Sequence, residues 1–203
     1  MGTVAELART TGWTGRSYVS PDWDAVERAL GVSLPAEYKE LLAVFPPGTF
    51  NAPFLGDGSV IVHPPYPVGG VPDQLHQFET EMDELRDWRA GHPADVARPV
   101  FPEPEGMIPW ARASRECLLW TRDSADPDRW AVAISNGGIW RYSEDSAVLE
   151  EFPVGAVDFL IGLVTGRITS RVLNPEGPDQ PGPARLAAFE PVPEEEWRSF
   201  SAG

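Results

Sequence analysis

Residues 107–142 read MIPWARASRECLLWTRDSADPDRWAVAISNGGIWRY, and this stretch decides the fold. Tryptophan recurs in it at ten-residue intervals, which match one short strand plus one turn. Asn136-Gly137 favours the type I′ turn of a two-residue hairpin. The stretch therefore predicts an antiparallel β-meander, in which Trp130, Val132 and Ile134 share one face. The predicted strands are Met107 to Trp110, Cys117 to Thr121, Trp130 to Ser135 and Ile139 to Tyr142.

Two amphipathic helices are predicted between residues 20 and 46. Ser20 is a candidate N-cap, Pro21 suits the first helical position, and Gly31 supplies a left-handed stop. Pro35 opens the second helix. The apolar stripes are Trp23, Val26 and Leu30 in the first helix, and Tyr38, Leu41, Leu42 and Phe45 in the second. Because the link between the helices is short, both stripes must pack on a common core.

Two further helices are predicted along the chain. The third follows Asp73 and carries an apolar stripe that includes Met82 and Leu85. At about 100° per residue, the side chains opposite this stripe are Asp83, Glu84 and Asp87, which should face water. The closing helix opens at Pro153 and is apolar enough to be buried. A strand at Ser59 to Val62 lies before the third helix.

These elements predict an α+β fold, in which helices flank an antiparallel-rich sheet within a single domain. The domain is expected over residues 20–173, with an insert at about 64–104. Residues 1–19 form an N-terminal extension whose weak helical pattern, Val4 to Ala8, predicts either a short helix that ends near Gly12 or a segment that frays. Residues 174–203 are rich in proline and acids, which predicts a poorly ordered tail on which Phe189 and Trp197 are candidates for docking.

The net charge restricts the class of partner. The 203 residues include 31 Asp plus Glu against 16 Lys plus Arg, a formal net charge of −15. This sign argues against a nucleic acid or an anionic membrane and favours a basic partner. No apolar run approaches the eighteen or so residues of a membrane span. The single cysteine and the lack of a secretory pattern in the first twenty residues predict a cytoplasmic protein.

Signatures of enzymes and of metal sites are absent from the sequence. It contains no G-x-S-x-G, H-E-x-x-H, P-loop or G-x-G-x-x-G motif. His63, His76 and His92 lack a second ligand at helical or hairpin spacing, and Cys117 reads as a buried hydrophobe. We therefore expect no catalytic residue, no metal and no cofactor. The tryptophans expected to serve mainly in packing are Trp23, Trp120, Trp130 and Trp140.

Three landmarks occur in a characteristic order. They are Trp23 to Glu27 with Leu30-Gly31 and Leu34-Pro35-Ala36-Glu37-Tyr38; the turn Asp126-Pro127-Asp128-Arg129-Trp130 into a strand; and Phe159-Leu160 with Leu163 in the closing helix. This order, over roughly residues 20–166, resembles the SMI1/KNR4 family of the SUKH superfamily. The chain departs from the family's pattern in the insert between Pro64 and Pro104 and in the tail beyond Asn174.

The resemblance implies an α+β domain without catalytic residues. Bacterial members of the family commonly act as immunity proteins that bind and neutralise a polymorphic toxin, often a nuclease. Fungal members resemble regulators or scaffolds in signalling. The family's shared positions serve the core, so the resemblance transfers no binding residue to this chain.

Two acidic segments supply the candidate contacts. Residues 73–88 carry six acids and one arginine, and residues 144–158 carry five acids with no Lys or Arg. Such clusters also occur as solvated faces, but a basic partner would use them for fast, salt-sensitive association. Trp88 lies at the flank of its helix stripe. The candidate partner-binding residues are Asp83, Glu84, Asp87, Trp88, Glu144, Asp145, Glu150 and Glu151.

The sequence thus favours a cytoplasmic immunity protein that covers the basic active-site cleft of a toxin domain. One alternative is a regulatory scaffold that docks a cellular protein through the proline-rich insert or tail. Another is a small hydrolase, which requires a concave pocket. The identity of the partner and the oligomeric state do not follow from the sequence.

Overall fold

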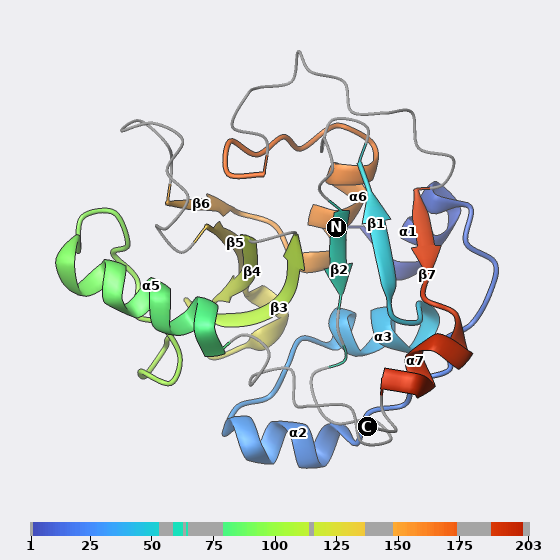
Figure 1. Ribbon diagram of the computed structural model, residues 1–203, viewed down its shortest axis with the longest axis horizontal. Helices are drawn as coiled ribbons and strands as arrows, with labels where there is room; N and C mark the ends of the chain where they lie inside the picture. The colour runs from blue at the N-terminus through green and yellow to red at the C-terminus, as the bar shows by residue number, and fades with distance from the viewer. Residues whose placement is uncertain are drawn as a thin grey trace.

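Seven β-strands form one antiparallel sheet, which confirms the predicted α+β class (Figure 1). The structure is a computed structural model that describes residues 2–52, 59–62, 64, 79–113, 116–136, 148–173 and 188–200. The strands are β1 Gly48–Asn51, β2 Ser59–Val62, β3 Ile108–Ala113, β4 Glu116–Thr121, β5 Ala131–Ser135, β6 Leu149–Phe152 and β7 Phe189–Pro191. Their order in the sheet is β6-β5-β4-β3-β2-β1-β7.

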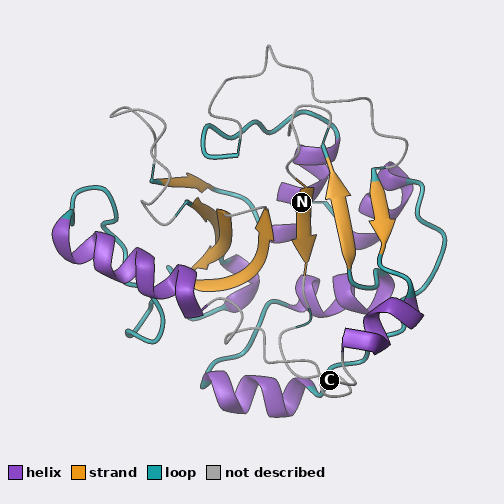
Figure 2. Cartoon of the chain, viewed as in Figure 1, coloured by secondary structure: helices purple, strands orange, loops and turns teal. Residues whose placement is uncertain are grey.

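Helices cover both faces of this sheet (Figure 2). Four helices contribute apolar side chains to the core on one face: α1 Val4–Thr11, α2 Trp23–Leu30, α3 Ala36–Val44 and α6 Ala156–Val164. Helix α5, Glu79–Gly91, packs on the other face. The 3-10 helix η1, Pro127–Arg129, precedes β5, and α7, Glu194–Phe200, follows β7. The single domain therefore has two hydrophobic cores, one on each side of the sheet.

Side chains of β4 and β5 alternate between the two cores, as the period of a strand requires. Those in the larger core, under the four helices, are Leu118, Trp120, Val132 and Ile134. Those in the smaller core, under α5, are Cys117, Leu119 and Ala133. Trp130 is 6% exposed and belongs to the larger core, so its predicted common face with Val132 and Ile134 is confirmed.

The predicted meander is confirmed in three strands and extended by another. β3, β4 and β5 occupy the first three predicted positions, with β3 running on to Ala113. The predicted hairpin turn and the strand Ile139 to Tyr142 lie outside the described residues. Among the described strands, β5 pairs instead with β6, where Ile134 lies opposite Glu150. β6 has no strand signal in the sequence, because two adjacent acids interrupt its apolar pattern, and β1 is likewise a strand without a prediction.

Helices α2 and α3 follow the predicted stripes, with one correction at a cap. Asp22, not Ser20, is the N-cap of α2, and its Oδ1 accepts a hydrogen bond from Ala25 N at 3.0 Å. Pro21 therefore lies outside the helix. Gly31 ends α2 with φ 71°, as predicted. The first turn of α3 is capped from η1, because Ala36 N donates to Asp128 Oδ1 at 2.6 Å.

Helix α6 is buried, as predicted, with eight of its nine residues inaccessible to water. Its N-terminus is joined to α3, because Ala156 N donates to Glu37 Oε1 at 2.6 Å. Burial raises the pKa of Glu37 above its ordinary value of 4.5, although the backbone donors of Ala156 and Val157 oppose the shift. A carboxylate at a helix N-terminus also complements the helix dipole.

The first helix is better fixed than its sequence pattern indicates. The Oγ1 of Thr3 caps α1 by accepting from Glu6 N, and Gly12 ends it in the left-handed conformation with φ 70°. Val4 and Leu7 are buried in the larger core. The predicted short helix ending near Gly12 is therefore confirmed, the alternative of a frayed segment is wrong, and α1 belongs to the same core as the rest of the domain.

The end of the chain joins the sheet. β7 pairs with β1, and Phe189 is buried against Trp13, Phe45 and Phe50, with ring centroids 4.8–5.1 Å apart. The expectation of a poorly ordered tail is wrong for residues 188–200. The composition of this segment does not reveal the free energy gained when one aromatic side chain is buried in an aromatic cluster. The predicted docking of Phe189 is confirmed.

Candidate functional site

Helix α5 presents the three predicted carboxylates on the side away from the sheet. Met82 and Leu85 are buried in the smaller core, which fixes the inner face of the helix. Asp83 and Asp87 are exposed, and Glu84 is half-buried. The predicted division of this helix into an apolar and an acidic face is confirmed for these residues.

Ion pairs within the chain distinguish one of these three carboxylates from the other two. Asp83 forms an ion pair with Arg86, one turn later. Arg89, the other described cation of α5, pairs with Glu103 at 2.8 Å. Within the described ranges, no cation pairs with Glu84 or Asp87. Among the described side chains of α5, these two are therefore the acids without a cationic partner.

Contacts within the chain hold the side chain of Trp88 and leave only part of it accessible. Its side chain is half-buried against the smaller core. Its Nε1 donates to Asp95 Oδ2 at 3.1 Å, and its ring stacks on His92 with centroids 4.1 Å apart. The part of the indole that remains accessible lies on the same helix as Glu84 and Asp87.

The predicted acids of the second segment have internal roles where the structure describes them. Glu150 Oε2 accepts from Ser170 Oγ at 2.7 Å and from Arg171 N at 2.9 Å, and its side chain is 16% exposed. Glu150 therefore fixes the turn after α6. Glu144 and Asp145 lie outside the described residues.

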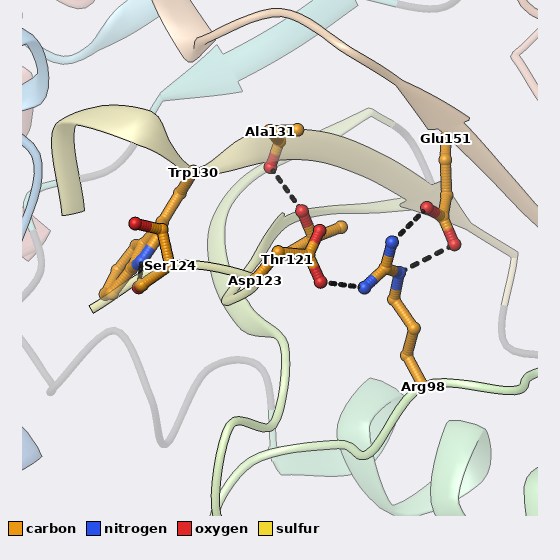
Figure 3. A network of polar contacts seen from close by, with 7 residues as sticks. All are labelled: Arg98, Thr121, Asp123, Ser124, Trp130, Ala131 and Glu151. Atoms are coloured by element: carbon orange, nitrogen blue, oxygen red, sulfur yellow. Dashed lines mark hydrogen bonds and ion pairs between the residues drawn. The ribbon is translucent and has the colours of Figure 1, made fainter. Parts of the chain in front are cut away.

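Arg98 joins two separate parts of the sheet (Figure 3). Its Nε and Nη2 donate to the two carboxylate oxygens of Glu151 on β6, at 2.8 and 2.7 Å. Its Nη1 donates to Asp123, in the loop after β4. These hydrogen bonds raise the pKa of Arg98 well above its ordinary value. Glu151 is thus half of a bidentate pair, and its charge is largely compensated.

A hollow of about 450 Å³ opens beside Trp130. Trp130 Nε1 donates to the Ser124 carbonyl at 2.8 Å, which holds the indole against the loop after β4 (Figure 3). Arg122 and Glu105 also line this hollow, and the sequence analysis named neither. A second hollow of about 420 Å³ shares Trp130 and is lined by Arg129 among others. Because the hydrolase alternative requires a concave pocket, the absence of catalysis stays a prediction.

Metal-binding and nucleophilic groups were sought in the described ranges. There, no three His, Cys, Asp or Glu side chains lie close enough together to hold a metal ion. Cys117 is buried, and burial raises the pKa of its thiol to about 12. A thiol in that state supplies almost no thiolate near neutral pH, so its interpretation as a small hydrophobe is confirmed.

Comparisons with known proteins leave the family open. No protein-family model matches this chain, and no curated protein or solved structure matches it. The resemblance to the SMI1/KNR4 family therefore stays a prediction. None of the helices in the described part of the chain is long and apolar enough to cross a membrane.

Proposed function

We propose that this chain is a non-catalytic protein-binding domain, and that it acts as an immunity protein against a bacterial polymorphic toxin. In this proposal the acidic face of α5 covers the basic active-site cleft of the toxin. Occlusion requires shape and charge only, so no catalytic residue, metal or cofactor takes part. A nuclease is the class of toxin with the most suitable cleft, because a cleft that binds nucleic acid is positively charged.

The observation that carries this proposal is the uncompensated charge on a fixed helix. Glu84 and Asp87 have no described cationic partner, while Met82 and Leu85 anchor the same helix to the sheet. Because the helix is already formed in the free chain, binding does not have to order its backbone. The net charge of −15 adds a long-range attraction toward a basic protein.

Trp88 supplies an apolar group next to these charges. Tryptophan is enriched among the residues that dominate binding energies at protein interfaces. Its bond to Asp95 and its stacking on His92 fix the indole before a partner arrives. The candidate contact surface is therefore Glu84, Asp87 and the accessible edge of Trp88, with Asp83 at its side.

The direct test uses a purified toxin domain encoded next to the gene for this chain. We expect the chain to inhibit that toxin in proportion to complex formation. The double variant Glu84→Lys, Asp87→Lys should lose inhibition by at least about tenfold, since like charges then face each other. The matched control Glu40→Lys, Glu190→Lys reverses two exposed acids on α3 and β7 and should inhibit like the wild type.

Two outcomes would contradict the proposal. One is full inhibition by the Glu84→Lys, Asp87→Lys variant. The other is a chain that binds no neighbouring toxin but forms a stoichiometric complex with a purified signalling protein, which is the outcome expected of the regulatory scaffold.

A further inference from the structure

A histidine continues the face of α5 that carries the candidate contact surface. Glu84, Trp88 and His92 follow one another at intervals of four residues, and this spacing places side chains on one side of a helix. Helix α5 ends at Gly91, but His92 N still donates to the Trp88 carbonyl at 2.8 Å. His92 is exposed, whereas Glu84 and Trp88 are half-buried. The imidazole therefore lies at one end of the candidate contact surface, where a partner can reach it.

Contacts with its neighbours hold His92 in place. Its ring stacks on the indole of Trp88, with ring centroids 4.1 Å apart and an angle of 16° between the planes. The turn after the helix is closed by Asp95 N, which donates to the His92 carbonyl at 3.0 Å. The same residue fixes the indole, because Asp95 Oδ2 accepts from Trp88 Nε1 at 3.1 Å. The imidazole is therefore presented on top of the indole.

The charged side chains around this stack are mostly acids. Of the described cations of α5, Arg86 forms an ion pair with Asp83, and Arg89, one turn before His92, pairs with Glu103 at 2.8 Å. Both cations are thus occupied within the chain. The other described charged side chains of the last two turns and of the turn after them are Glu84, Asp87 and Asp95.

Histidine differs from these acids in the pH range of its charge change. Imidazole is the side-chain group whose charge ordinarily changes between about pH 5 and pH 8. Carboxylates ordinarily keep their negative charge throughout that range. A fall in pH therefore adds a positive charge at the end of the candidate contact surface and leaves its acids charged. A positive charge there repels a basic partner.

We propose that His92 makes this surface pH-dependent, so that a basic partner binds near neutral pH and binds more weakly below about pH 6. The inference rests on the proposed function, because it assigns a regulation to the same acidic face. Linkage makes the effect reciprocal, since a ligand that binds the neutral form more tightly must oppose protonation of His92. Binding at low pH then releases a proton.

The test uses octalysine as a basic probe. Its charge stays constant over the range, because lysine ordinarily titrates at about pH 10.4. The readout is the indole N–H resonance of Trp88 in the ¹⁵N-labelled full-length chain, assigned by its loss in Trp88→Phe. At low salt we expect octalysine to bind the wild type at least about threefold more weakly at about pH 5.5 than at about pH 7.5. Equal affinity at the two pH values would overturn the proposal.

Variants assign the effect to one histidine. His92→Gln keeps a polar side chain without the charge change, so its affinity for octalysine should be the same at both pH values. The matched control His63→Gln, His76→Gln removes the other two histidines of the sequence and should keep the wild-type pH dependence. A pH dependence that persists in His92→Gln, or that disappears in the control, would overturn the assignment.

The same titration with the neighbouring toxin domain separates this inference from the proposed function. The quantity compared is the ratio of wild-type to His92→Gln affinity, in which any titration of the toxin itself cancels. We expect this ratio to fall by at least about threefold between about pH 7.5 and pH 5.5. A constant ratio in a chain that inhibits the toxin would refute the role of His92 and retain the proposed function. A chain that binds no toxin but shows the His92-dependent change with octalysine would do the reverse.

Discussion

The hydrophobic core on one face of the sheet is much larger than the core on the other face. On one face, four helices bury a large core that includes stacked Trp110 and Trp120, with ring centroids 5.8 Å apart. On the other face, α5 and the segment that follows it cover a much smaller core. The outer surface of α5 carries two acids, Glu84 and Asp87, that have no described cationic partner. We therefore expect the core on the first face to contribute most of the stability, and the helix on the second face to present negative charge.

This difference also predicts how the molecule opens. Segments that bury few apolar contacts exchange their amide protons through local unfolding, below the free energy of global unfolding. Helix α5 is the element on the smaller core, so it should open before the helices on the larger core.

The largest effect is expected in the larger core. Leu160 is fully buried on α6, which lies between α1, α3 and the sheet. Leu160→Ala leaves a cavity that fixed neighbours cannot fill, so the free energy of unfolding should fall by about 4 kcal/mol. Urea unfolding with an unchanged slope checks this value. A loss below about 1 kcal/mol would show that the larger core does not determine stability.

A smaller and more local effect is expected under α5. Leu85 is 1% exposed, but the helix above it can shift into the space that truncation creates. Leu85→Ala should therefore cost about 2 kcal/mol, near the lower end for such substitutions. Hydrogen exchange should accelerate in α5 and remain slow in α6. Equal acceleration in both helices would contradict the separation of the two cores.

The acidic residues show the same contrast, because some accept hydrogen bonds within the fold and others have no described bond. Glu150→Ala removes an acceptor from Ser170 Oγ and Arg171 N, and should destabilise the chain by about 1–3 kcal/mol. Glu84→Ala removes no described bond and should stay within about 0.5 kcal/mol of the wild type. Thermal unfolding of the two variants, side by side, tests the division. It would be refuted by equal losses of stability.

Much of the fold was predictable from local patterns, and the failures have physical causes. The stripes of α3 and α6 and the meander of β3 to β5 are periodic, so residue spacing alone indicates them. β6 was missed because Glu150 and Glu151 interrupt its apolar pattern, although the Glu150 carboxylate accepts hydrogen bonds from Ser170 Oγ and Arg171 N within the fold. β7 was missed because the aromatic cluster that receives Phe189 is assembled from distant residues.

The candidate site was predictable in part for the same reason. Helical geometry placed Glu84 and Asp87 on the outer face of α5 without any knowledge of tertiary structure. The hollow at Trp130 has no such local signal, because Arg122 and Glu105 come together only when separate loops meet. Whether an acid is paired with a cation also depends on the tertiary structure, as the ion pair between Arg98 and Glu151 shows.

The smallest effect concerns pH. Because burial raises the pKa of Glu37, the folded chain holds this proton more tightly than the unfolded chain does. The contribution of Glu37 to stability is therefore fully present below the unfolded pKa and is lost as pH rises through the folded pKa. Glu37→Gln removes this dependence, so its stability relative to wild type should improve as the pH rises above the ordinary pKa of 4.5. A relative stability that worsens over that range would reverse the assigned direction.

The association rate between this chain and the neighbouring toxin domain, measured across salt concentrations, tests the central claim most directly. We expect the wild-type rate constant to fall steeply between about 50 and 500 mM salt, because screening shortens the range of the attraction. The Glu84→Lys, Asp87→Lys variant should associate at least about tenfold more slowly at low salt, and the two rates should converge at high salt. A wild-type rate that does not change with ionic strength would contradict an acidic docking face on α5.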